Sequence, residues 1–115
     1  MKVIIAGSRT LTNYQTVLDA IAASGFFISQ VVSGGASGVD QLGELYAFEQ
    51  DLSLKVFPAK WSLYGKGAGP IRNQEMADYA EALIAVWDGE STGTKDMIAR
   101  ARDKGLEVYV HVVST

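Results

Sequence analysis

The chain of 115 residues has no cysteine, a single histidine and only two prolines. Without cysteine there is neither a disulfide framework nor a thiolate nucleophile, and one histidine makes a histidine-based metal site unexpected. No stretch approaches the roughly 20 apolar residues of a membrane helix. The apolar run at residues 1–7 is too short for a signal peptide. We therefore expect a cytoplasmic protein with no metal, no resident cofactor and no membrane contact.

An excess of positive charge is also missing. The 13 acidic and 10 basic side chains give a formal net charge of −3, whereas proteins that bind nucleic acid usually carry a basic face. Nucleic acid is therefore not an expected partner. Hydrophobic residues make up 48% of the chain, which is enough for a packed core. The length and composition predict one domain over residues 1–115.

Short apolar runs alternate with longer segments of helical periodicity. The expected strands cover residues 2–6, 30–33, 54–57, 82–87 and 107–112. The expected helices cover residues 14–23, 38–50, 71–81 and 94–104. This alternation predicts an α/β, Rossmann-like three-layer sandwich. Its five-stranded parallel sheet is expected to have the order 3-2-1-4-5.

Local signals mark the ends of these elements. Thr12 is the expected N-cap of the first helix, with Gln15 completing a capping box, and Gly25 is expected to end that helix. Ser37 is expected to cap the second helix. Residues 59–69 are expected to form a long irregular loop, a kind of segment that is often functional.

Three glycine-containing loops follow strands that this order places side by side. They span residues 7–9, 33–38 and 88–94. Backbone amides and helix N-termini are well suited to hold phosphate, and ligands bind where the strand order reverses. The sequence therefore predicts one pocket for a small phosphorylated, nucleotide-like ligand. Its expected binding residues are Gly7, Ser8, Arg9, Ser33, Gly34, Gly35, Gly38, Asp40, Arg72, Asp88, Gly89, Ser91, Thr92, Gly93 and Thr94.

The spacing of the glycines differs from that of the dinucleotide-binding fingerprint. That fingerprint follows the first strand as Gly-x-Gly-x-x-Gly. Here Gly34, Gly35 and Gly38 follow the second expected strand as Gly-Gly-x-x-Gly. NAD-dependent oxidoreduction is therefore not expected.

Several side chains near the loops have a functional and a structural interpretation. Arg72 and Arg9 carry planar guanidinium groups that suit phosphate. Glu75 lies one helical turn after Arg72 and is expected to pair with it. Asp40 is a candidate for a ribose hydroxyl, or it merely favours a helix N-terminus.

The expected loop at residues 59–69 contains two aromatic side chains, Trp61 and Tyr64. Aromatic rings in such a loop stack on a base or cover a pocket. Alternatively, they only pin the loop to the domain. The sequence does not decide between these two interpretations.

The three loops, together with residues 57–61, 68–69 and 72–76, resemble the YspA/YpsA-related branch of the SLOG superfamily, which is often seen in phage and bacterial genomes. That superfamily also holds the Lonely Guy phosphoribohydrolases and the DprA DNA-processing proteins. The resemblance implies a Rossmann-like fold and a nucleotide-type ligand at the glycine loops. Relatives tend to dimerise through helices beside the pocket, so the resemblance also implies a homodimer or a higher homo-oligomer.

Three functions remain open at this point. The first is binding of a nucleotide-derived ligand in a sensor, sequestering or processing role. The second is N-glycosidic cleavage of a nucleoside monophosphate, as in the phosphoribohydrolases. Their catalytic glutamate falls on Met97 here, and a thioether is no acid or base, so Glu75, Asp88 or Asp96 would have to supply the carboxylate. The third is a DNA-binding module like DprA, against which the acidity and the small size argue.

Overall fold

The computed structural model describes residues 1–114 as a five-stranded sheet between helices. The strands are β1 (Lys2–Gly7), β2 (Gln30–Ser33), β3 (Ser53–Val56), β4 (Ala82–Trp87) and β5 (Glu107–Val112). The helices are α1 (Tyr14–Ser24), α2 (Val39–Glu49), α3 (Trp61–Tyr64), the 3-10 helix η1 (Gly65–Gly67), α4 (Ala68–Tyr79) and α5 (Thr92–Asp103).

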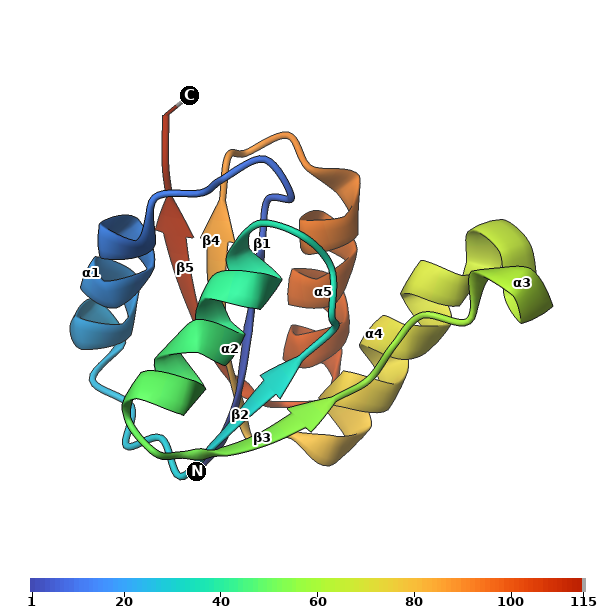
Figure 1. Ribbon diagram of the computed structural model, residues 1–115. Helices are drawn as coiled ribbons and strands as arrows, with labels where there is room; N and C mark the ends of the chain where they lie inside the picture. The colour runs from blue at the N-terminus through green and yellow to red at the C-terminus, as the bar shows by residue number, and fades with distance from the viewer. Residues whose placement is uncertain (115) are drawn as a thin grey trace.

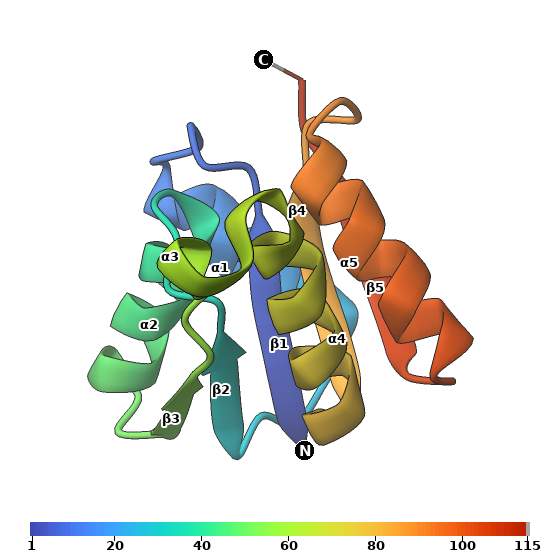
Figure 2. The ribbon, with the colours of Figure 1, turned by 90° about the vertical axis from the view of Figure 1, so that its right-hand side faces the viewer.

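All neighbouring strands are parallel, and their order is β3-β2-β1-β4-β5. Helices α1 and α2 cover one face of the sheet, and α4 and α5 cover the other (Figures 1 and 2). The predicted fold class and strand order are therefore confirmed. The order reverses between β1 and β4, so the carboxyl ends of these strands open into a crevice.

Each face of the sheet has its own hydrophobic core. Along β1 the side chains alternate, so that Val3 and Ile5 join the core under α1 and α2, while Ile4 and Ala6 join the core under α4 and α5. Burial of one such aliphatic side chain contributes about 1.5–3 kcal/mol. Because both faces are covered, β1 and β4 are continuous apolar runs rather than alternating ones. The rigid centre of the sheet thus holds the loops that follow β1 and β4.

Two of the predicted helix caps are wrong. The N-cap of α1 is Asn13, whose Oδ1 accepts a hydrogen bond from Thr16 N at 3.3 Å, and not Thr12. The amide oxygen of Asn13 reaches the first turn directly and so displaces the expected capping box. At α2 the N-cap is Gly38, which has no side-chain cap, and the Ser37 hydroxyl instead donates to Arg9 O at 3.5 Å. Gly25 ends α1 in the left-handed conformation, as predicted.

The segment expected as an irregular loop is largely helical. Lys60 O accepts hydrogen bonds from Leu63 N and Tyr64 N, which closes the single turn of α3, and η1 leads directly into α4. Helix α4 begins at Ala68, three residues before the expected start, with Pro70 in its first turn. A four-residue helix shows no periodicity in a sequence, so the signal was absent. The α3 segment projects away from the sheet on the side of α4 (Figures 1 and 2).

Across residues 1–114, no helix is long and apolar enough to cross a lipid bilayer.

Candidate functional site

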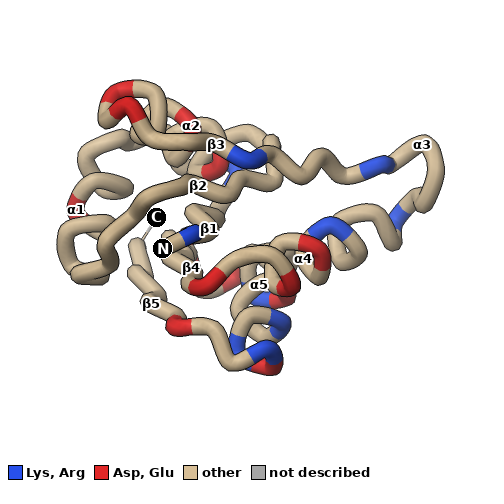
Figure 3. Tube along the Cα trace, turned by 90° about the horizontal axis from the view of Figure 1, so that it is seen from below, with Lys and Arg blue, Asp and Glu red and all other residues tan. Residues whose placement is uncertain are grey.

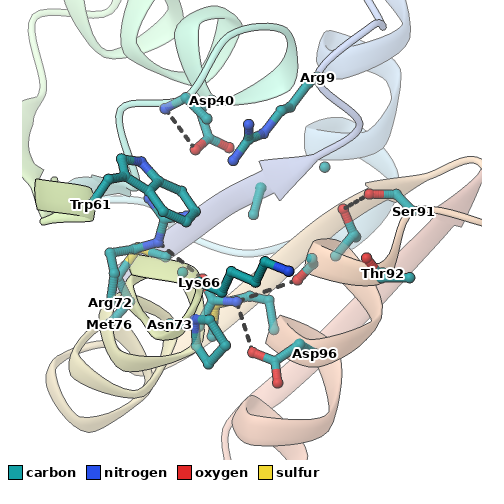
Figure 4. A pocket seen from close by; sticks show the side chains of 18 residues that line it. Arg9, Asp40, Trp61, Lys66, Arg72, Asn73, Met76, Ser91, Thr92 and Asp96 are labelled. Atoms are coloured by element: carbon teal, nitrogen blue, oxygen red, sulfur yellow. Dashed lines mark hydrogen bonds between the residues drawn. The ribbon is translucent and has the colours of Figure 1, made fainter. Parts of the chain in front are cut away.

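A cavity of about 620 Å³ opens at the carboxyl ends of the central strands (Figure 4). We call it the main cavity. Its volume lies in the range of small-molecule binding sites. Its walls come from β1, from the start of α2, from the α3–η1 segment and from the first turns of α4 and α5. The lining residues are Ala6, Gly7, Arg9, Ala36, Asp40, Trp61, Lys66, Gly69, Pro70, Arg72, Asn73, Met76, Ser91, Thr92, Gly93, Thr94, Asp96 and Met97.

A smaller hollow of about 190 Å³ adjoins the main cavity. We call it the side chamber. Residues 34–37 form one of its walls, and Pro58 and Ala59 form another. Arg9, Ala36, Trp61 and Arg72 line both spaces, so the two share a wall.

The loop after β2 uses two of its amides internally. Gly35 N donates to Ser33 Oγ at 3.1 Å, and Ala36 N donates to Asp40 Oδ2 at 3.2 Å. The Ser33 hydroxyl in turn donates to Glu44 Oε2 at 2.7 Å. These two amides are therefore not free to hold a phosphate.

Gly38 is required by packing rather than by a ligand. Its φ is +74°, a conformation that costs other residues free energy, and a side chain there would collide with the carbonyl oxygens of Ser8 and Arg9. The close contact is locked by the hydrogen bond from Val39 N to Ser8 O. It holds the loop after β1 against the start of α2.

Arg72 is a buried cation that joins two walls of the cavity. Its Nη1 donates to Gly34 O at 2.5 Å, and its Nε donates to Asn73 Oδ1 at 3.0 Å. Only 8% of the residue is exposed, and burial lowers the pKa of its guanidinium. The predicted pairing with Glu75 is wrong. The Arg72 side chain turns inward toward the β2 loop and away from the outer face of α4, whereas Glu75 is exposed.

Asn73 continues this network to α5. Its Nδ2 donates to Gly93 O at 3.3 Å and to Asp96 Oδ2 at 2.9 Å. The same Asp96 oxygen accepts from Arg100 Nε at 2.9 Å. The carboxylate of Asp96 thus lines the cavity while it accepts hydrogen bonds from Asn73 and Arg100.

Asp40 is the carboxylate of the opposite wall (Figure 4). It is 5% exposed, and burial raises its pKa to about 6, although Arg72 and Arg9 partly oppose this shift and Glu44 adds to it. Its Oδ2 accepts from Ala36 N, whereas Oδ1 accepts no hydrogen bond from residues 1–114. In residues 1–114 every fully buried side-chain oxygen has a partner. Asp40 Oδ1 must therefore reach the cavity.

The N-terminus of α5 opens into the same cavity. Its N-cap, Ser91, forms no side-chain capping bond, and its hydroxyl accepts from Thr94 Oγ1 at 3.3 Å instead. The first N–H groups of a helix have no partner within that helix. The amides of Thr92, Gly93 and Thr94 are thus left without a side-chain cap at the positive end of the helix dipole.

Asp88 shapes this turn from outside the cavity. Its Oδ1 accepts from Glu90 N at 2.9 Å and from Ser91 N at 2.7 Å. These hydrogen bonds, the one from Ser91 first, lower the pKa of the carboxyl. Trp87 Nε1 donates to Ser91 O at 3.0 Å, which fixes the same turn from the strand side.

Two exposed cations, Arg9 and Lys66, line the cavity. The Arg9 guanidinium lies 5.9 Å from the centre of the Trp61 ring, and in Figure 4 the Lys66 side chain extends across the middle of the view. Neither cation is part of an ion pair in residues 1–114. Within the same residues no three histidine or acidic side chains converge to hold a metal ion.

The structure brings together most of the side chains predicted for the site. The residues that line the main cavity are Gly7, Arg9, Asp40, Trp61, Arg72, Ser91, Thr92, Gly93, Thr94 and Asp96. Gly34 and Gly35 line the side chamber. Those that line neither space are Ser8, Ser33, Gly38, Tyr64, Glu75, Asp88 and Gly89.

Sequence reasoning missed several lining residues, above all Asn73 and Lys66. Asn73 directly follows Arg72 in the first turns of a helix, and this polar pair was an available signal. Lys66 lies in a glycine-rich segment that was expected to be irregular, so no pattern directed it toward the cavity.

Comparisons with known proteins show the family and the fold of this chain. A similar protein, the Gene 61 protein of Mycobacterium phage D29, is 32% identical over 116 residues, which cover 93% of each chain. DNA processing protein A (DprA) from Streptococcus pneumoniae has a similar fold, with a TM-score of 0.74 and 17% identity over 95% of this chain. This chain spans 49% of that DprA chain. The family model described as YspA, cpYpsA-related SLOG matches residues 1–64, and the chain therefore belongs to this family.

Proposed function

We propose that the main cavity binds a nucleotide or a nucleotide-derived ligand and holds its phosphate at the N-terminus of α5. The observation that carries this proposal is the uncapped first turn of α5, which lines the cavity. Backbone N–H groups and the helix dipole at such a turn favour a phosphate. Arg9 and Lys66 line the same cavity and add positive charge.

The charges of the cavity also orient the ligand. Asp40 lies on another wall, beside β2-loop amides that are already occupied. An anionic phosphate would be repelled there and attracted at α5. The Trp61 ring, half exposed beside Arg9, provides a face on which a base can stack.

Membership of the SLOG family is consistent with a small nucleotide-related ligand. The charge distribution supports the same conclusion. In Figure 3, both α4 and α5 carry basic as well as acidic residues, so neither helix has charge of one sign only. A nucleic-acid backbone is normally met by clustered positive charge.

Cleavage of the bound ligand is a second candidate function. The observation that favours it is the presence of two carboxylates, Asp40 and Asp96, on opposite sides of one cavity (Figure 4). Of the three residues expected to supply a catalytic carboxylate, only Asp96 lines the cavity, whereas Glu75 and Asp88 do not. Chromatography of a long incubation with adenosine 5′-monophosphate tests this function, since cleavage releases free adenine and binding alone does not.

Two variants at Gly93 that differ in charge but hardly in size test the phosphate site. A Cβ at Gly93 would meet no atom within 4 Å, so Gly93→Gln and Gly93→Glu both fit. Removing a helical glycine stabilises by up to about 1 kcal/mol, and a glutamate near a helix N-terminus adds roughly 0.3–1 kcal/mol. We therefore expect both variants to unfold at or above the wild-type temperature.

Binding should separate the two variants. With adenosine 5′-monophosphate and adenosine 5′-diphosphate as probes, Gly93→Glu should bind at least about tenfold more weakly than Gly93→Gln, because the added carboxylate competes with the phosphate for the same amides. Isothermal calorimetry measures the difference. Equal affinity of the two variants would place the phosphate elsewhere.

A further inference from the structure

At the start of α2, the wall of the main cavity carries a carboxylate with one oxygen that accepts no hydrogen bond from residues 1–114. Asp40 is 5% exposed, and its Oδ2 is bound to Ala36 N at 3.2 Å. Its Oδ1 has no hydrogen-bond partner among the described residues and reaches the cavity. A desolvated acceptor that stays unpaired costs free energy. The position therefore favours a ligand atom that donates a hydrogen bond.

We propose that Asp40 determines the specificity of the cavity by accepting hydrogen bonds from the sugar hydroxyls of the ligand, and that it thereby selects ribonucleotides over deoxyribonucleotides. This inference rests on the proposed function, because it adds the sugar to a ligand whose phosphate is held at α5. Asp40 then acts as a specificity-determining residue and takes no part in a reaction.

The surroundings of Asp40 exclude the other parts of a nucleotide. A phosphate finds uncapped amides at the first turn of α5, whereas beside Asp40 the amides of Gly35 and Ala36 are already occupied. A cationic group would meet Arg72 and Arg9, which both lie close enough to act on the charge of Asp40. A base is better placed on the Trp61 ring, where its flat face finds an aromatic partner. A neutral hydroxyl donor is the group that remains.

The ionised carboxylate is also the stronger acceptor. Hydrogen bonds to a charged group are roughly twice as strong as those between neutral groups. Sites built around such a bond reject analogues that lack the donor, because the protein group is then buried without a partner. The discrimination should therefore be large even though it depends on one side chain.

The test compares three probes at pH 7.5 by isothermal calorimetry: adenosine 5′-monophosphate and its 2′-deoxy and 3′-deoxy analogues. Wild-type protein should bind at least one deoxy analogue about tenfold or more weakly than the ribonucleotide. Asp40→Asn keeps the size of the side chain and an oxygen for Ala36 N, but turns a donor toward the cavity. It should bind the ribonucleotide at least about tenfold more weakly, with a ribo-to-deoxy ratio near one.

Asp19→Asn on the exposed surface of α1 is the matched control and should keep the wild-type affinities. If wild-type protein binds all three probes with equal affinity, the inference is overturned and the phosphate site still stands. If Asp40→Asn remains folded and keeps the wild-type ratio, the discrimination comes from another residue and the inference is also overturned. If no probe binds at millimolar concentration, the proposed function fails and the inference fails with it.

Discussion

At the scale of single residues, function and stability conflict at Asp40. The carboxylate is buried, and its pKa is raised from 3.8 to about 6. The folded state therefore holds its proton more tightly than the unfolded state. Ionised Asp40 lowers the free energy of unfolding at neutral pH, and this penalty disappears as the pH falls toward the unfolded pKa. Such a cost is typical of residues kept for binding rather than for folding.

Asp40→Asn should consequently stabilise the protein at pH 7 and not at pH 4. The raised pKa corresponds to a difference of at most about 3 kcal/mol in the free energy of unfolding at pH 7. Most of this difference between the two proteins should be gone by pH 4. Urea unfolding of both proteins at the two pH values measures it. Arg72, Arg9 and Glu44 are the charged groups that act on Asp40, so the comparison is repeated in a Glu44→Gln background. A difference that does not change with pH would show that the carboxyl is not buried as described.

Substitutions at two glycines distinguish the free-energy cost of a left-handed backbone from the cost of a steric clash. Gly38 and Gly25 have φ values of +74° and +70°, but only at Gly38 would a Cβ collide with neighbouring backbone, while at Gly25 it would meet nothing within 4 Å. Gly25→Ala should cost about 1–2 kcal/mol of stability for the left-handed conformation alone. Gly38→Ala should cost clearly more. Chemical denaturation checks the ranking, and equal costs would mean that the loop after β1 does not press against the start of α2.

At the scale of elements, the sequence predicted the bounds of most strands but not the shortest helix or the exact helix caps. The bounds of β2, β4 and β5 match the predicted ranges. For β2 and β4 the physical reason is a short buried apolar run flanked by polar or glycine residues. Helix α3 was missed because one turn has no period, and the start of α4 was placed too late for the same reason. The cap at Asn13 shows the limit of pattern reasoning, since Thr12 and Asn13 are both good caps and only the path of the chain selects one.

The candidate site was predictable as a location but not as a set of contacts. The three glycine loops do converge, since the strand order places β1 between β2 and β4. Nothing in the sequence showed that Ser33 and Asp40 would occupy the amides of the β2 loop. These hydrogen bonds occupy two amides of the three-loop phosphate site that the sequence predicted, and the proposed phosphate site is therefore the N-terminus of α5.

The hydrogen bonds of Arg72 and Asn73 join elements far apart in sequence. They link the β2 loop, α4 and α5. Three walls of the cavity are thus tied to one another through these two side chains. Pre-formed sites of this kind bind with little cost in conformational entropy.

At the scale of the whole molecule, the two faces of the sheet have different tasks. Among the described residues, the core under α1 and α2 shares no side chain with the main cavity, whereas Ala6, Met76 and Met97 of the core under α4 and α5 line it. The edge strand β3 is exposed along its length, and Phe48 is exposed on nearby α2.

The homodimer expected from the family resemblance remains a prediction. Light scattering of the purified protein, which measures its molar mass in solution, tests it.

The central claim is that phosphate binds at the first turn of α5 inside one shared cavity. Chemical-shift mapping of the backbone amides during titration with adenosine 5′-monophosphate tests it most directly. The account predicts the largest shifts at Thr92, Gly93 and Thr94, and smaller ones at Gly35 and Ala36, whose amides are already bonded. Shifts that are largest in the β2 loop, or confined to surfaces away from the cavity, would contradict it.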